Sequence, residues 1–339
     1  MKQLALLALL GGCLTPPAAP GGPERAWTRV ADGALPGRMH GARLTWDPQR
    51  DAIVMYTGYN ATQNLAPGYV YKWQANEWMR ICEEGVGPPP LYLPGFTWEP
   101  SGQLVLVGGA QIVPGAGLFD NVSKDIYTCD TTGVWTKQTN TLQRERAGAS
   151  LIYDPQRDRL MLVGGRDRNG PIKNAEMSAP NAQDFTIHPA QMPFASAGAG
   201  QTAMYDADSK MIFALEGETT GDDDTPLHDA IWTYDGAAWT RFCNDCSGAP
   251  RADASIVHIH GTNETYVIAG FAGNSRDHAG TWVIDQNKLL RVFDEPDARA
   301  SVGAAYSDTT DSIVMFGGTS VNCEEYECDA TFELSIQPQ

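Results

Sequence analysis

Short apolar runs recur along the chain, and each follows a polar turn and ends at or near a glycine. Two copies are nearly the same, WDPQRDAIVMYTG at 46–58 and YDPQRDRLMLVGG at 153–165. The acid–proline pair favours a tight turn because proline fixes φ near the value that this position needs. The aliphatic run after it is typical of a buried strand. Each copy therefore predicts a β-hairpin with an apolar second strand.

Weaker copies of this hairpin lie between and after the two strong ones. They are WEPSGQLVLVGG (98–109), YDADSKMIFALEG (205–217), HIHGTNETYVIAGF (258–271) and YSDTTDSIVMFGG (306–318). The glycine ends of the six copies are spaced by about 50 residues, which is the length of a propeller blade. Six hairpins in register predict six blades.

A second pattern follows the hairpins: an aromatic residue, a short spacer and a tryptophan. It is clearest in YKWQANEW (71–78) and WTYDGAAW (232–239), and it is one residue longer in YTCDTTGVW (127–135). Degenerate versions lie around 177–185 and 282–289. Each repeat is therefore expected to hold four strands, of which the fourth starts at the tryptophan.

Together these patterns resemble the kelch-repeat family, whose signature is a double glycine, a spacer, a tyrosine, six residues and a tryptophan. The matching residues are Gly108–Gly109, Gly164–Gly165, Gly317–Gly318, Tyr71 and Trp78. The resemblance covers nearly everything from Trp27 to Ile336. It implies an all-β, six-bladed kelch-type β-propeller with four antiparallel strands per blade. Another antiparallel fold, such as a sandwich, is the alternative.

The two ends of the repeat region indicate how the ring closes. The last repeat has a hairpin and a third strand, DATFELSI (329–336), but no tryptophan-bearing fourth strand. A surplus copy of that strand, AWTRV (26–30), precedes the first hairpin and is similar to AAWTRF (237–242). We expect this N-terminal strand to complete the last blade, because an open blade edge leaves backbone groups unpaired. Residues 26–339 would then form one domain.

The chain begins with MKQLALLALLGGC, which is typical of a targeting segment and too short to span a bilayer. Residues 1–12 are expected to be a signal peptide. The last four letters resemble the lipobox of bacterial lipoproteins, which implies lipidation of Cys13; an ordinary secretory signal is the alternative. Residues 13–25 would form the lipidated cysteine and a flexible tether. Leu14 rather than Asp after Cys13 favours the outer over the inner membrane of a bacterial envelope.

Six further cysteines are disulfide candidates, because an even number in an exported protein indicates pairing. They are Cys82, Cys129, Cys243, Cys246, Cys323 and Cys328. Spacing allows one small loop in CNDC and another in CEEYEC, and the first two cysteines could join neighbouring blades. A redox or zinc half-site at CNDC is the alternative, but no second pair has zinc spacing, and a thioredoxin-like site needs a helix.

The formal net charge of −17 makes the chain a poor candidate for nucleic-acid binding, which needs a basic face. The acidic run GDDDT (221–225) lacks the alternating ligands of a calcium loop, so we interpret it as a solvated loop. No metal site and no cofactor is predicted from the sequence.

Four arginines recur at similar distances before the hairpin turns and are candidate ligand-binding residues. They are Arg38, Arg251 and Arg299, nine residues before Asp47, His260 and Asp308, and Arg146, eight before Asp154. Pro90 and Ala197 break the pattern in the other two blades. Equivalent positions should share one face of the propeller, where guanidinium groups would bind carboxylate or other anionic ligands, with His40 beside them. Pairing of each arginine with an acid of the next blade is the alternative.

The first function hypothesis is a binding module for a protein or glycan of the cell envelope. The second is an enzyme acting on a sugar, since some related propellers are copper-radical oxidases or sugar epimerases. An oxidase would need histidine and tyrosine ligands together at the axis. His258 and His260 face one side of a strand, but the sequence places no tyrosine beside them. Serine-hydrolase and zinc-protease motifs are absent, so no catalytic residue is predicted. A structural subunit of an envelope complex is the third hypothesis.

Overall fold

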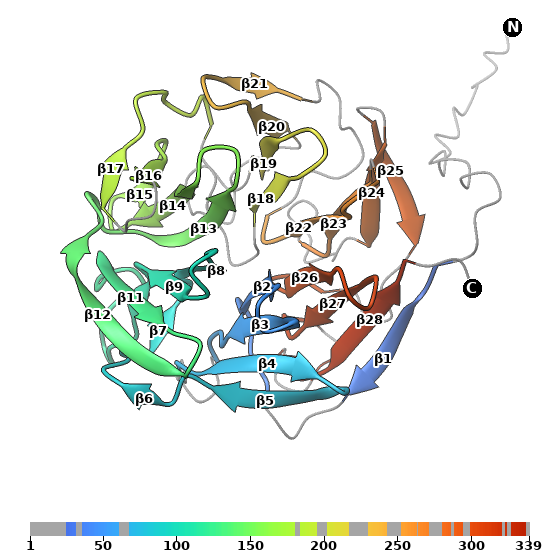
Figure 1. Ribbon diagram of the computed structural model, residues 1–339, viewed down its shortest axis with the longest axis horizontal. Helices are drawn as coiled ribbons and strands as arrows, with labels where there is room; N and C mark the ends of the chain where they lie inside the picture. Colours follow the sequence, from blue (N-terminus) through green and yellow to red (C-terminus); the bar gives the residue numbers. More distant parts are fainter. Residues whose placement is uncertain are drawn as a thin grey trace, which may run out of the picture.

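A computed structural model describes residues 25–31, 36–60, 68–179, 184–194, 202–216, 230–242, 252–262, 264–270, 280–285, 288–293, 299–320, 323 and 327–336. This part of the chain consists of strands and turns, and six antiparallel blades surround a central axis (Figure 1). Within the same residues, no helix is long and apolar enough to cross a membrane. The predicted six-bladed β-propeller is confirmed.

The strands of each blade follow chain order from the axis to the rim. Blade 1 contains β2 (Arg43–Asp47), β3 (Ala52–Tyr56), β4 (Val70–Gln74) and β5 (Glu77–Ile81). Blade 2 contains β8 (Gly95–Trp98), β9 (Leu104–Val107), β11 (Asp125–Cys129) and β12 (Val134–Thr141). Blade 3 contains β13 (Ala147–Asp154), β14 (Arg159–Asp167), β16 (Glu176–Ser178) and β17 (Phe185–Ile187).

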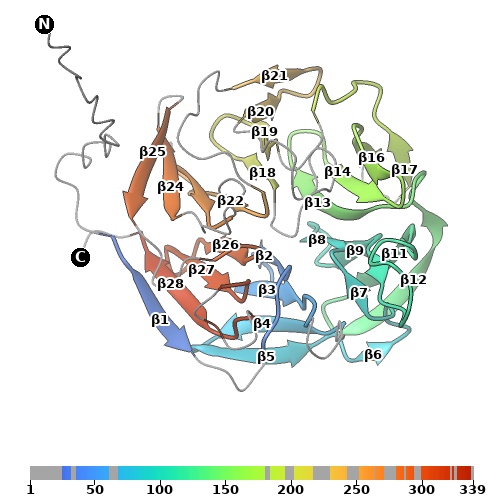
Figure 2. The ribbon, with the colours of Figure 1, turned by 180° about the vertical axis from the view of Figure 1, so that it is seen from behind.

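The second half of the ring repeats this order, except that the rim strand of blade 6 is the N-terminal strand (Figure 2). Blade 4 contains β18 (Ala203–Asp206), β19 (Met211–Leu215), β20 (Ile231–Tyr234) and β21 (Trp239–Arg241). Blade 5 contains β22 (Ser255–His258), β23 (Thr265–Ile268), β24 (Thr281–Asp285) and β25 (Lys288–Phe293). Blade 6 contains β26 (Gly303–Ser307), β27 (Ser312–Phe316), β28 (Thr331–Ser335) and β1 (Trp27–Ala31).

Blades 2 and 3 carry four additional short strands that the repeat pattern does not predict. They are β6 (Glu84–Gly85), β7 (Leu91–Tyr92), β10 (Ala110–Gln111) and β15 (Gly170–Pro171). Strand β6 pairs in parallel with β12, whereas β7 pairs antiparallel with β10 and β15 pairs antiparallel with β14.

An aspartate at the end of the inner strand shapes several of the hairpin turns. The carboxylate of Asp47 accepts hydrogen bonds from the backbone N–H groups of Gln49 and Arg50, at 3.0 and 3.1 Å. Asp154 accepts the same bond from Gln156 at 3.0 Å. Aspartate favours turns because its side chain bonds to the backbone two or three residues further on. This explains why the acid opens the turn in these hairpins.

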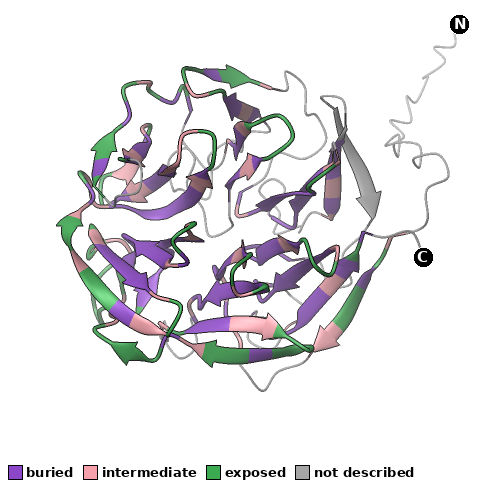
Figure 3. Cartoon of the chain, in the orientation of Figure 1, coloured by how far each residue is buried: buried purple, intermediate pink, exposed green. Residues whose placement is uncertain are grey.

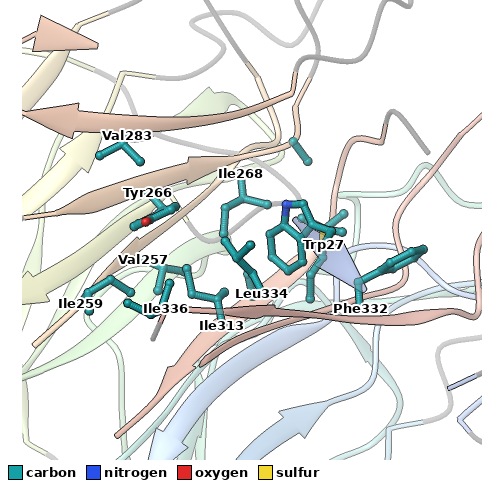
Figure 4. Packing of buried hydrophobic residues seen from close by; sticks show 14 of the residues in the cluster. Trp27, Val257, Ile259, Tyr266, Ile268, Val283, Ile313, Phe332, Leu334 and Ile336 are labelled. Atoms are coloured by element: carbon teal, nitrogen blue, oxygen red, sulfur yellow. The ribbon is translucent and has the colours of Figure 1, made fainter. Parts of the chain in front are cut away.

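The N-terminal strand β1 closes the ring, as predicted. It pairs antiparallel with β28, and Trp27 lies opposite Leu334. The Trp27 side chain packs in a hydrophobic cluster formed by blades 5 and 6 (Figure 4). Its indole Nε1 donates a 2.9 Å hydrogen bond to Thr281 Oγ1 in blade 5, and Trp78 makes the same bond to Thr331 in blade 6. The tryptophan of the fourth strand therefore links its blade to the preceding one at both places.

The double glycines mark a close approach between neighbouring blades. Gly317 and Gly318 both have positive φ, 69° and 95°, a region that favours glycine. The N–H of Gly318 donates to the carbonyl oxygen of Met39 at 2.9 Å, and a Cβ on Gly317 would lie 2.5 Å from the same oxygen. A side chain at Gly317 would therefore push blades 6 and 1 apart.

Burial decreases from the axis to the rim (Figure 3). The inner strand β13 is buried along nearly its whole length, whereas β5 at the rim buries little beyond Trp78. Apolar side chains of adjacent blades pack face to face, and the hydrophobic clusters therefore lie between blades. All six inner strands run in the same direction, so their first residues meet at one end of the central channel and their last residues at the other.

Candidate functional site

Arg146, one of the predicted ligand-binding arginines, is fully buried at the end of the channel where the inner strands begin. Its guanidinium forms an ion pair with the equally buried Glu176, with Nη2 2.6 Å from Oε1. It also donates to the carbonyl oxygens of Gly164 and Asn174, at 2.9 and 3.0 Å. These partners belong to its own blade, so the side chain ties blade 3 together and presents no surface to a ligand in this conformation.

Arg299 holds the same place in blade 6, and Met39 holds it in blade 1. Arg299 is buried, and its Nη1 donates to the carbonyl oxygen of Gly317 at 2.8 Å. Gly303 lies opposite Phe316 in blade 6, and Arg43 lies opposite Tyr56 in blade 1, so these two pairs are equivalent. The residues four positions before Gly303 and Arg43 are Arg299 and Met39, which are therefore equivalent as well. Arg38 therefore lies one residue before the repeated position. Arg251 lies outside the described residues.

His40, two residues after Arg38, belongs to a separate cluster. Its Nδ1 is 2.9 Å from the carboxylate of the buried Glu327, and its ring packs edge-on against Tyr59 and Tyr92. Burial, as the largest cause, raises the pKa of Tyr92 above its usual range. This cluster joins blades 1, 2 and 6 near the beginning of the inner strands.

Backbone hydrogen bonds link the blades around this same end of the channel. Gly41 N–H donates to Ser301, Ser301 N–H to Asp253, and Gly148 N–H to Leu93, each at 2.8 or 2.9 Å to the carbonyl oxygen. All five residues have positive φ, from 51° to 70°. Backbone hydrogen bonds therefore connect blades 5, 6 and 1, and blades 2 and 3, at this end of the channel.

Two of the predicted disulfides are confirmed. Cys82, just after β5, is bonded to Cys129 in β11 and joins blades 1 and 2, and Cys323 is bonded to Cys328. Disulfides persist in oxidising environments, so the protein matures outside a reducing cytoplasm. Cys243 and Cys246 lie outside the described residues, as do Cys13 and the rest of residues 1–24.

The opposite end of the channel has a ring of aromatic and imidazole side chains, one from each blade. All six occupy the equivalent position of their inner strands when these strands are aligned by their pairing with the second strand of the blade. The ring consists of Trp46, Trp98, Tyr153, Tyr205, His258 and Tyr306. We call this ring and the space it surrounds the aromatic mouth.

The aromatic mouth surrounds a cavity of about 300 Å³. All six ring residues line it, together with apolar side chains such as Leu44, Leu151 and Ile256. The described residues that line it include His260 and Asp308, but no lysine or arginine. A concave, largely apolar site with a few polar groups is the usual form of a small-molecule site in proteins.

The tyrosines of the mouth are held by the hairpin turns. Tyr153 donates from its hydroxyl to Asp158 at 2.7 Å, and Tyr306 donates to Asp311 at 2.8 Å. Burial and the acceptor carboxylate raise the pKa of Tyr153 to about 12. Both hydroxyls are therefore occupied as donors and protonated at neutral pH. Fixed hydroxyls fix the orientation of the two rings.

Carboxylates and imidazoles gather where blades 4, 5 and 6 meet the aromatic mouth. His258 Nε2 lies 2.9 Å from Asp206 Oδ1 and 3.0 Å from Asp208 Oδ2, and His260 Nδ1 lies 2.7 Å from Asp308. Burial by itself would raise the pKa of Asp206, but hydrogen bonds, above all from His258, outweigh it and lower this pKa to about 2. The hydrogen bond to Asp308, as the largest cause, raises the pKa of His260. These groups are the titratable donors and acceptors of the aromatic mouth.

The sequence contained the signal for this mouth, although the arginines were chosen as the candidates. The six ring residues are the first letters of the six hairpin copies: W, W, Y, Y, H and Y. When the six repeats are aligned, these residues fall in one column. The column shows that every blade has an aromatic or imidazole ring at the same position. The tyrosine missing beside the two histidines is Tyr306, whose ring centroid lies 5.8 Å from that of His260.

Comparison with known proteins supports the fold. No family model matches the chain, and no curated protein sequence matches it. Among solved structures, the chain is similar to that of YjhT, with a TM-score of 0.69 and 14% sequence identity over 91% of this chain and 97% of the other. At this identity the likeness shows a shared six-bladed propeller architecture and no more.

Proposed function

We propose that the protein is an exported, lipid-anchored, kelch-type binding module that holds a neutral glycan of the cell envelope in the aromatic mouth. The observation that carries this proposal is the ring of six aromatic and imidazole side chains around a cavity of about 300 Å³. The C–H groups of a sugar ring pack well on the electron-rich face of an aromatic side chain. A ring of such faces on rigid strands favours a sugar or short oligosaccharide.

The charges at the mouth favour a neutral glycan over an anionic one. Asp208 and Asp308 lie at its edge, and the described lining includes no lysine or arginine to pair with an acidic sugar. The buried Arg146 and Arg299 belong to the other end of the channel. Recognition at the aromatic mouth would therefore depend on stacking and on hydrogen bonds to the few polar groups.

An array of neutral and acidic envelope oligosaccharides tests the proposal with the purified wild-type protein. Trp98→Ala should lower the affinity for neutral glycans at least tenfold, because it removes one stacking face. Tyr59→Ala and Arg38→Ala are matched controls at the opposite end of the channel, and each should keep wild-type affinity. Loss of binding in Arg38→Ala but not in Trp98→Ala would place the ligand at the arginine end and overturn the proposal.

A sugar-converting enzyme is the second candidate, and one observation favours it. The aromatic mouth holds four titratable groups close together: His258, His260, Asp308 and Tyr306. An enzyme that transfers protons on a bound sugar would need donors and acceptors side by side in this way. The test is to incubate the neutral glycans bound by the wild type with the protein and follow their NMR spectra. Turnover lost in His260→Gln would support an enzyme, whereas unchanged spectra would leave binding as the function.

A further inference from the structure

Asp206 ends the inner strand of blade 4, Asp208 lies two residues later in the hairpin turn, and His258 ends the inner strand of blade 5. One ligand atom from each of these residues lies within 4.8 Å of the others, and His258 also lines the cavity of the aromatic mouth. We propose that these three residues form a binding site for a divalent transition-metal cation.

The spacing of the ligand atoms fits octahedral coordination. With metal–ligand bonds of about 2.1 Å, two ligands at a right angle to each other are separated by about 3.0 Å. The distances from His258 Nε2 to Asp206 Oδ1 and to Asp208 Oδ2 are 2.9 and 3.0 Å. These are also the lengths of hydrogen bonds from the imidazole, so a cation would replace the Nε2 proton with little movement of the two carboxylates.

The ligands are held in place from behind. His258 Nδ1 is 3.2 Å from the hydroxyl of Thr265, which turns Nε2 towards the two carboxylates. Asp206 accepts from the N–H of Asp208 at 2.8 Å and from the Ser209 hydroxyl at 2.6 Å. Outer hydrogen bonds of this kind orient the ligands of metal sites and raise their affinity.

The donor set and the accessibility define the class of cation. One imidazole with two carboxylates suits Zn²⁺, Mn²⁺ or Fe²⁺, whereas Ca²⁺ and Mg²⁺ prefer oxygen ligands alone. His258 and Asp206 are buried, but the Asp208 side chain is 38% exposed. A cation could therefore enter on the side of Asp208, where water would complete its coordination.

Metal binding is measured on the purified protein without a histidine tag, with its cysteines oxidised. Isothermal titration with Zn²⁺ and with Mn²⁺ should give one site in the wild type. Asp208→Asn should weaken this site at least tenfold, because it removes a charged ligand that lies in an exposed turn. Asp51→Asn is the matched control: it removes one charge from an exposed hairpin turn of blade 1 and should leave the affinity unchanged.

A second measurement does not depend on variants. Pulsed electron paramagnetic resonance of the Mn²⁺-loaded wild type should show coupling to one imidazole nitrogen. Absence of metal uptake at 100 µM, on the order of a weak physiological affinity, would overturn the proposal, and so would equal affinity in the wild type and Asp208→Asn. Neither titration contains a glycan, so failure of metal binding is distinguishable from failure of the proposed function.

Discussion

The guanidinium of Arg146 donates a 2.9 Å hydrogen bond to the carbonyl oxygen of Gly164, 18 residues further along the chain. Arg299 makes the same bond to Gly317 over the same separation. In blades 3 and 6 this side chain ties the beginning of the inner strand to the end of the second strand. The repeated arginine is thus part of the blade's construction, and the preference for arginine follows from its several donors.

Replacement of Arg146 by Met should lower the free energy of unfolding by about 3–5 kcal/mol, because Glu176 would be left as a buried charge without its cation. Denaturant unfolding followed by tryptophan fluorescence measures this loss. Lys137→Met is the control, because Lys137 and its partner Asp125 are both partly exposed, so this substitution should change the free energy of unfolding little. Equal losses in the two variants would contradict a special role for the buried pair.

Trp27→Ala should destabilise the protein by about 3–5 kcal/mol, since it empties a large space between blades 5 and 6. Trp27→Phe keeps most of the packing and loses the hydrogen bond to Thr281, so it should cost about 1 kcal/mol. Trp78→Phe removes the equivalent bond to Thr331 and should cost the same. Thermal and denaturant unfolding check both values. A harmless Trp27→Ala would mean that the ring does not depend on its closing strand.

The two disulfides should differ in their contribution to stability. The bond Cys82–Cys129 spans 47 residues, and on a chain-entropy basis its removal by a double alanine substitution should cost about 4 kcal/mol. The bond Cys323–Cys328 spans five residues and should cost about 2 kcal/mol. The midpoints of guanidinium unfolding of the two double variants give the comparison. A larger loss for the short loop would show that the long loop retains structure when unfolded.

His188 should make stability fall in mild acid. It packs against Tyr234, with its Nε2 2.5 Å from the hydroxyl, and burial lowers its pKa from the usual value of about 6.5. Below that value the unfolded chain takes up a proton that the folded protein excludes, so stability is present above pH 6.5 and declines as the pH falls. The free energy of unfolding of the wild type and of His188→Gln, measured from pH 7.5 to 5.5, gives the contribution of this histidine. If both proteins lose stability equally with falling pH, the loss is due to other groups.

Lipidation is tested at Cys13. Cys13→Ser should abolish incorporation of a fatty-acid label and move the protein from the detergent phase to the aqueous phase of cell extracts. Mass spectrometry of the N-terminal peptide gives the modification directly. An unmodified wild-type N-terminus after cleavage would mean that the segment is an ordinary secretory signal.

The hairpins could be predicted from the sequence because their apolar runs and turn residues are local features. The closing strand could be predicted because its letters repeat those of Trp239 and its neighbours. The arginine alignment was harder, because the turns differ by one residue: Asp47 pairs with Ala52, whereas Ser307 rather than Asp308 holds that place in blade 6. Counting back from the turn residue therefore assigns Arg38 to the repeated arginine position, whereas the strand pairing assigns Met39 to that position.

The cluster of Asp206, Asp208 and His258 could not be found from linear spacing. Two of its members come from a turn and the third comes from the next blade, with 50 residues between Asp208 and His258. Only the rotation from blade to blade brings them together. The aromatic mouth is different, since one aligned column of the repeats contains all six of its rings.

The strand that closes the ring is also the place where tension on the N-terminus would enter the fold. Strand β1 is held at the rim by its pairing with β28 and by the packing of Trp27 (Figure 1). A pull from that end would load this seam before any other blade, and the aromatic mouth at the axis would be deformed last. The pairing of Trp27–Ala31 with β28 is therefore the first contact that such a pull would have to break.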